Sequence, residues 1–372
     1  MFHKKFTLLF VFYVSYLWFV LIGTSILPTH FLNQKLSLSE MIMGLLFKFV
    51  APIILLLYVK HISAKKSWLI ALFSALIYIL LSISIQNKYQ FYLASLISGL
   101  PVFYFYLCYN IAYFENVSKE KRGQGSALMF IVPSVIGVAA PSLSGFVGQK
   151  NMIYVWIISV ISFFISLIIL RFQSDYQMTL SIKEAIIEIK ETKIFIFLEG
   201  VWDTVMGAII PIYTLYFIRS PLKYGIYLSY LALISVVMSF ILGKVSDKFQ
   251  KRVIFVFPLT IILAMTTFMF AILKSNLTNW IILTGILKFI EPLFRSTSVS
   301  LLIDNHSDVR KLMSGRELML STGRITGLVL AFASFTIERQ PFYIFIVLGS
   351  AMLLYSILLF WKTKVSKVCN FC

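Results

Sequence analysis

Five charged residues in two apolar segments have the types and spacing needed to bind a polar solute or a proton inside a membrane. Glu199 and Asp203 lie four residues apart in "FIFLEGVWDTVMGAIIPIY", so a helix would place them on one face. Lys288, Glu291 and Arg295 follow steps of three and four in "LTGILKFIEPLFRSTS" and would also share a face. A carboxylate beside cations can gain or lose a proton when its surroundings change. We therefore expect these five residues to bind substrate or couple protons.

Three further polar residues are candidates for the same role. Lys48, Arg324 and Asn110 each lie inside an otherwise apolar stretch. An ionisable group within a membrane costs about 2.5–3.5 kcal/mol or more, which makes it a functional hypothesis by default. Two alternatives remain open, because Glu199 could extend to nearby headgroups and Arg295 could anchor at the inner interface. No His lies in the middle of a span, so proton coupling would use carboxylates.

The composition places these residues in a membrane protein. Of the 372 residues, 59% are hydrophobic and only 13% are charged, which is too little polar surface for a soluble protein of this length. The first apolar run is too long for a signal peptide, and no cleavage site follows it. A span needs about 20 mostly apolar residues. The sequence predicts twelve such spans, near 6–28, 41–59, 67–86, 91–114, 125–148, 152–171, 194–218, 224–243, 253–273, 277–302, 316–337 and 341–361.

The cations predict the orientation of these spans. With the N-terminus inside, the inner segments hold 22 lysines and arginines and the outer segments hold seven. The positive-inside rule then places both termini in the cytoplasm of a multi-pass protein of the cell membrane. The same rule accounts for most of the net charge of +18, so we expect contacts with membrane lipids and none with nucleic acid. The high Lys, Ile and Phe content with short loops suggests a bacterial inner membrane.

Two halves of six spans are expected on either side of a central polar stretch. "FENVSKEKRGQGSALM" and "IDNHSDVRKLMSGREL" resemble each other at an offset of 189 residues, as in the repeats of secondary transporters. Ser37 and Glu40 have the spacing of a capping box that would open the second span. The predicted organisation is an N-terminal six-helix bundle over 1–171, a cytoplasmic linker with a short interfacial helix over 172–193, a C-terminal six-helix bundle over 194–361 and a cytoplasmic tail over 362–372.

The segment "GKVSDKFQKR" between spans 8 and 9 carries a gating motif. The residues concerned are Gly243, Asp247, Lys248, Lys251 and Arg252. Their pattern and position resemble those of the major facilitator superfamily, over nearly the whole chain. The resemblance implies an all-α membrane protein of twelve helices, in two bundles related by a pseudo-twofold axis. A glycine permits close helix approach, and an aspartate can bind the N–H groups at a neighbouring helix start. An ordinary basic loop is the alternative.

Two other segments correspond less closely to that family. "LYVKHISAKK" occupies the place of the first-half motif, but Leu57 and His61 replace its Gly and Asp. "APSLSG" in span 5 is similar to the family's antiporter signature through Pro141 and Gly145, which favours efflux. The alternative for this segment is a Pro-kinked span with small residues for close packing.

The sequence thus predicts a secondary active transporter that moves a small organic solute by alternating access, as a proton-coupled antiporter or symporter that favours efflux. Proton-coupled uptake of a sugar or metabolite is the alternative, and a non-transporting polytopic protein or a membrane enzyme is the third reading. The sequence has no nucleotide-binding loop and no cluster of nucleophile, base or metal ligands, so we expect no cofactor, metal or catalytic residue. We also expect a monomer. The partners would be the substrate, protons and lipids.

Overall fold

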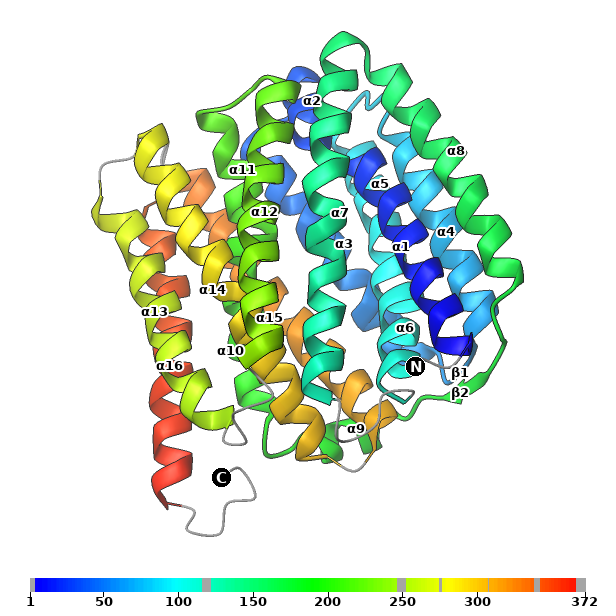
Figure 1. The fold of residues 1–372 in the computed structure, drawn as a ribbon. Coiled ribbons are helices and arrows are strands. Elements are labelled where there is room, and N and C mark those ends of the chain that lie inside the picture. Colours follow the sequence, from blue (N-terminus) through cyan, green and yellow to red (C-terminus); the bar gives the residue numbers. More distant parts are fainter. Residues whose placement is uncertain are drawn as a thin grey trace.

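Long helices run side by side in two groups that pack along their lengths (Figure 1). The computed structural model describes residues 4–115, 122–245, 252–273, 276–306, 308–337 and 342–365, and at some helix ends it describes only the backbone. The start of α1, the end of α16 and the β1–β2 ribbon lie at one end of the bundle, called here the termini side, and the opposite end is the distal side.

The N-terminal half contains the first six membrane-crossing rods. Its helices are α1 (Lys4–Thr24), α2 (Leu27–Asn33), α3 (Leu38–Tyr58), α4 (Ala64–Leu81), α5 (Lys88–Pro101), α6 (Cys108–Glu115), α7 (Arg122–Lys150) and α8 (Met152–Arg171). A π-helical segment, Val102–Leu107, joins α5 to α6 in one continuous rod.

The C-terminal half repeats this arrangement after the linker. Its helices are α10 (Lys193–Thr204), α11 (Ile210–Tyr213), α12 (Pro221–Val245), α13 (Arg252–Ile272), α14 (Leu277–Asp304), α15 (Val309–Ile337) and α16 (Tyr343–Val365). A second π-helical segment, Val205–Ile209, joins α10 to α11, and a 3₁₀ turn, Thr214–Tyr216, ends that rod.

The twelve predicted spans correspond to twelve helical rods, with two notable differences in their bounds. Span 1 breaks between α1 and α2, just before Pro28, so the rod extends to Asn33. Span 11 was predicted to begin at residue 316, but α15 begins at Val309. The cations of its first two turns lower the hydropathy there, and the residues from Leu312 to Gly315 are buried in the protein rather than in lipid. The predicted capping box of span 2 is present: Ser37 Oγ accepts from the Glu40 N–H, and the Glu40 carboxylate accepts from the Ser37 N–H.

A short antiparallel ribbon was not expected from the sequence. β1 (His61–Ser63) pairs with β2 (Gln177–Thr179) of the linker, which then forms α9 (Ile182–Glu188). Asp175 accepts hydrogen bonds from the Ser63 hydroxyl at 2.8 Å and from the Lys65 N–H at 3.1 Å, at the start of α4. Burial would raise the pKa of the Asp175 carboxyl, but these hydrogen bonds hold that pKa below its ordinary value. The linker ribbon therefore binds to the N-terminal half, whereas α9 packs against α15 of the C-terminal half.

The two halves contact each other mainly through two helix pairs, α7 with α12 and α3 with α15, and α7 also touches α14. At the distal end of α7, the backbone at Gly145 lies against α12, where an added Cβ would be 2.7 Å from the Pro221 carbonyl oxygen. Ser142 donates a hydrogen bond of 2.6 Å to Ser229 in the same contact. Small residues permit this approach, so the predicted span-5 pattern has a packing role in the structure.

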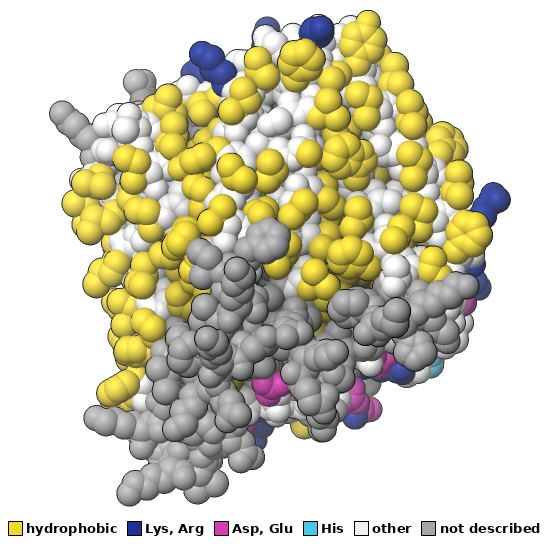
Figure 2. Space-filling view, in the orientation of Figure 1, with side chains coloured by type: hydrophobic (Ala, Val, Ile, Leu, Met, Phe, Trp, Pro, Cys, Tyr) yellow, Lys and Arg dark blue, Asp and Glu magenta, His cyan; other side chains and the backbone are white. Residues whose placement is uncertain are grey.

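The outer surface of the bundle is that of a multi-pass membrane protein. Among the described residues, eleven helices are long and apolar enough to cross a membrane, and the twelfth is shorter, over Val256–Ile272. Figure 2 shows hydrophobic side chains over the flank of the bundle, whereas Lys and Arg lie toward its two ends. On α8, for example, Ile157, Ile161 and Ile168 are about half exposed. Lipid chains can cover these side chains without a polar penalty.

Candidate substrate and coupling site

Asp203 is the centre of a buried network of charges in the C-terminal half. Its carboxylate, which is 7% exposed, accepts from the Arg324 Nε of α15 at 2.6 Å. Its other oxygen is bound by Arg295 Nη2 of α14. Charge-assisted pairing of this kind offsets the cost of removing three charges from water. The structure thus joins α10, α14 and α15 through one carboxylate.

Glu291 extends this network along α14, as the spacing of the sequence predicts. The Glu291 carboxylate accepts from Lys288 Nζ and from Arg295 Nε, each at 2.7 Å. Arg295 therefore bridges Glu291 and Asp203 in the protein interior. The alternative that Arg295 anchors at the membrane interface is wrong, because both of its partners are buried carboxylates.

Glu199 belongs to a second group of charges nearer the termini side. It is 1% exposed, and its carboxylate accepts from Arg316 Nη2 at 2.8 Å and from the Ser298 hydroxyl at 3.1 Å. The alternative that Glu199 extends to headgroups is therefore wrong. Glu199 and Asp203 share a helix face, yet they bind different arginines.

Sequence reasoning missed Arg316 and Glu317. The predicted span 11 begins at residue 316, which places Arg316 at the membrane boundary, but it lies two turns inside α15. Glu317 is 7% exposed and contacts Arg324 at 3.5 Å and the Ser321 hydroxyl at 2.9 Å. The available signal was an adjacent Arg-Glu pair with helical spacing to Arg324.

A close helix crossing positions Asp203 next to Arg324. Gly200 of α10 lies against the backbone of α15, and a Cβ at this position would be 2.5 Å from the Leu320 carbonyl oxygen. Gly323 of α15 lies in the same contact, with Val201 of α10 as its neighbour. Two glycines let the backbones touch, so that a short Asp side chain can reach the Arg324 guanidinium.

The network forms the wall of a cavity between the halves on the termini side. From the C-terminal half, this cavity of about 310 Å³ is lined by Asp203, Arg295, Arg316, Glu317 and Arg324 and by the apolar Val299, Met313 and Leu320. Glu199, Lys288 and Glu291 belong to the network but do not line the cavity. The N-terminal half contributes Tyr13, Lys48, Phe49, Val102, Tyr106, Asn110, Phe114, Met129 and Pro133. Charged groups thus face mainly aromatic and apolar groups across the cavity.

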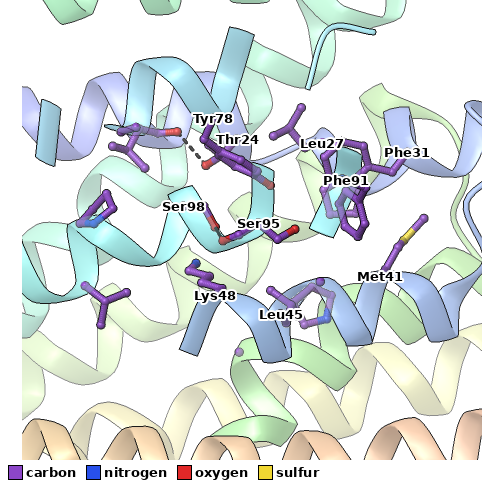
Figure 3. Close-up of a pocket in the computed structure, with 18 of the residues that line it drawn as sticks. Thr24, Leu27, Phe31, Met41, Leu45, Lys48, Tyr78, Phe91, Ser95 and Ser98 are labelled. Carbon is purple, nitrogen blue, oxygen red and sulfur yellow. Dashed lines mark hydrogen bonds between the residues drawn. The ribbon is translucent and has the colours of Figure 1, made fainter. Parts of the chain in front are cut away.

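A second cavity, of about 230 Å³, lies toward the distal side (Figure 3). Phe31, Met41, Leu45 and Phe91 form much of its apolar wall. Hydroxyl groups are contributed by Tyr16, Thr24, Tyr78, Ser95, Ser98 and Tyr106. Lys48, Val102 and Tyr106 line both cavities, so these two spaces adjoin at the middle of the bundle.

Both π-helical segments lie beside the cavities. Val102 and Tyr106 come from the first segment, which follows Pro101, and Gly207 of the second segment lines the distal cavity. Proline removes a backbone donor, and the wider π turn changes which side chains face inward. π-helical turns of this kind are frequent at functional sites.

Asn110 and the aromatic residues give the N-terminal side of the site a different character. The Asn110 Oδ1 atom is buried, lines the termini-side cavity and has no hydrogen-bond partner among the described residues. Tyr16 and Phe105 stack with ring centroids 3.4 Å apart, and Tyr13 stacks on Tyr109 at 4.1 Å. The ion pair described for α6 joins Glu115 at its end to Arg310.

The gating motif is only partly visible. Asp247, Lys248 and Lys251 lie outside the described residues, and only the backbone is described at Gly243 and Arg252, in α12 and α13. Pro141 and Gly145 pack against α12, as described above. Among the residues that the structure describes, no group of His, Cys, Asp and Glu is arranged to hold a metal.

The helices and the site together define a class: a multi-pass membrane protein whose two six-helix halves enclose a charged central cavity. Over 96% of its length the chain is similar in structure to the human organic anion transporter MFSD10 (TETRAN), with a TM-score of 0.67, 13% identity and 100% of that chain covered. It is likewise similar over 96% of its length to a mutant of the nucleoside transporter NupG, with a TM-score of 0.66, 13% identity and 99% coverage. No family profile and no curated protein sequence matches the chain. The chain has the major facilitator fold.

Proposed function

We propose that the protein is a secondary active transporter that moves a small organic solute across the cell membrane by alternating access. The observation that carries this proposal is a pair of adjoining cavities between the halves, one of which is walled by buried ion pairs. A solute held there can be exposed to either side when the halves rock about their contacts. The similarity to solved transporters supports the same reading.

Proton coupling is part of the proposal. Glu199, Asp203, Glu291 and Glu317 are buried and paired with cations, so a change in pairing between two states would change their proton affinity. A proton gradient can drive the transport cycle only if the proton affinity of these carboxylates differs between the two states. We propose Asp203 and Glu291 as the coupling carboxylates, with Lys288, Arg295 and Arg324 as the cations that control them.

The direction we propose is export, on the resemblance of the Pro141–Gly145 segment to the antiporter signature. Uptake of a sugar or metabolite is the alternative, and the similarity to a nucleoside transporter favours testing it. A non-transporting membrane protein would not need buried charges around a central cavity. We propose a monomer with both termini in the cytoplasm, in keeping with the distribution of its cations.

Transport by the purified full chain in liposomes tests the function. Organic anions, sugars, nucleosides and amphipathic cations would be offered with and without an imposed pH gradient. We expect one class to accumulate only with the gradient, in wild type and in the control variant Glu184→Gln, which changes an exposed residue of α9 outside the two cavities. Failure of every class to accumulate, with intact folded protein in the liposomes, would overturn the proposal.

A further inference from the structure

Lys48 differs from the other cations of the site in its partners. Each of the other four, Lys288, Arg295, Arg316 and Arg324, contacts at least one buried carboxylate. Lys48 has no carboxylate partner among the described residues, and its contact is with the Phe49 ring, 5.8 Å from Nζ to the centroid. Among the described residues of the site, these five cations are matched by four carboxylates, Glu199, Asp203, Glu291 and Glu317, which leaves an excess positive charge at Lys48.

The position of Lys48 makes this excess charge accessible to a ligand. Lys48 lies on α3 and lines both cavities at their junction. Figure 3 shows its side chain extending from α3 into the cavity, toward Ser98 of α5. The Arg324 guanidinium lies 4.9 Å from the same Phe49 ring, so two cations approach each other here. An anion at the junction would reduce the repulsion between them.

The distal cavity has the complementary chemistry for the rest of such a ligand. Its described lining contains one charged residue, Lys48, among apolar, aromatic and hydroxyl side chains. An ammonium taken out of water is costly unless an opposite charge pairs with it. A wall of Phe31, Leu45 and Phe91 is suited to an apolar or aromatic body, and Ser95 and Ser98 can orient a polar substituent.

We propose that the substrate is an organic anion whose headgroup binds Lys48 at the junction and whose apolar body fills the distal cavity. The headgroup class is a carboxylate, sulfonate or phosphate ester, since the structure specifies only its negative charge. This inference rests on the proposed function, because it assumes that the solute passes through these cavities. A neutral sugar or an organic cation would leave the Lys48 charge unpaired.

A matched pair of probes tests whether the headgroup of the ligand must carry a negative charge. The thermal stability of the purified full chain in detergent is titrated with 2-naphthalenesulfonate and with 2-naphthalenesulfonamide, which have the same body and differ in charge. Wild type should bind the sulfonate, and Lys48→Gln should weaken that binding by about tenfold or more, as expected for loss of a desolvated charge partner. Lys48→Arg should retain most of the affinity for the sulfonate. Binding of the neutral sulfonamide should be weak, and it should be the same in wild type and in both Lys48 variants.

The control variant is Lys88→Gln, which removes the same charge from an exposed position at the start of α5. It should leave sulfonate binding at the wild-type level. The proposal is overturned if Lys48→Gln binds the sulfonate as tightly as wild type, if wild type prefers the sulfonamide, or if wild type binds neither probe. Selective binding without accumulation of any solute in liposomes would contradict the transport function and leave the anion site standing.

A substitution in the wall of the distal cavity tests whether the apolar body of the substrate binds there. Leu45→Trp narrows the distal cavity, and Leu45 does not line the termini-side cavity. Binding of 2-naphthalenesulfonate should weaken by at least several-fold more than binding of 1-butanesulfonate. Equal effects on both sulfonates would place the body outside the distal cavity and contradict this part of the proposal.

Discussion

The two halves have the same helical arrangement but meet the cavity with different chemistry. The N-terminal half presents aromatic rings, hydroxyls and Lys48, which has no carboxylate partner among the described residues. Tyr16 of this lining stacks on the buried Phe105. The C-terminal half presents Asp203, Arg295 and Arg324, which belong to a continuous set of ion pairs that also includes Glu291. A stack of rings has one favourable packing, whereas ion pairs can exchange partners or gain a proton. The difference suggests that the C-terminal half carries the switchable interactions.

The largest effect should come from breaking the charged centre. Asp203→Asn leaves Arg295 and Arg324 buried without their shared carboxylate, which should cost about 3–5 kcal/mol of stability. The matched change in the other half is Tyr109→Phe, because the Tyr109 hydroxyl is buried without a hydrogen-bond partner among the described residues. That change should be neutral or slightly stabilising. Thermal unfolding of both variants in detergent measures the difference, and equal stabilities would remove the contrast between the halves.

The contact between the halves should be the next most sensitive. Gly145→Leu would force a side chain into the α12 backbone near Pro221, at a cost of about 1–3 kcal/mol. Spin labels on Gln149 and Ser220, whose side chains hydrogen-bond at 2.8 Å, should move apart in this variant. Gly207→Leu is the control, since no atom lies within 4 Å of an added Cβ there. An unchanged distance in the Gly145 variant would show that α7 and α12 adapt without separating.

The linker contact should give a smaller, pH-dependent effect. Asp175→Ala removes an acceptor from the start of α4, and loss of such a cap costs about 0.5–2 kcal/mol. Because the folded-state pKa of Asp175 is lowered, its contribution is present above the unfolded pKa near 3.9 and is lost as the pH falls through the folded value. The stability difference between wild type and the variant should therefore be constant from about pH 5 to 7 and shrink below about pH 4. A stability difference between wild type and the variant that increases as the pH falls would contradict this prediction.

The smallest effect should come from the exposed ion pair between the halves on the termini side. Arg310 Nε donates to the Glu115 carboxylate at 2.6 Å, and both side chains are a third or more exposed. Exposed pairs contribute about 0.2–1 kcal/mol. A double-mutant cycle with Glu115→Gln and Arg310→Gln should give a coupling in that range that decreases with added salt. A coupling above about 2 kcal/mol would mean that this pair, and not the buried network, controls closure.

The sequence predicted the span positions, the capping box at Ser37 and the charged faces of α10 and α14, because these follow from local spacing and hydropathy. It did not predict the β1–β2 ribbon or the role of Arg316 and Glu317. Those features depend on tertiary contacts between segments more than a hundred residues apart, such as Asp175 with Ser63 and Arg316 with Glu199. Hydropathy also misplaced the start of α15, since helical turns inside a protein need not be apolar.

The central claim is that the carboxylates of the C-terminal half couple solute movement to protons. The most direct test is accumulation of a transported solute in liposomes under an imposed pH gradient, compared with exchange of the same solute at equilibrium. Glu291→Gln keeps the Asp203 pairs with Arg295 and Arg324, so it should fold, lose accumulation and retain exchange. Asp203→Asn should behave in the same way wherever it folds. If folded Glu291→Gln and Asp203→Asn proteins both accumulate solute like wild type, the network is structural and the account is contradicted.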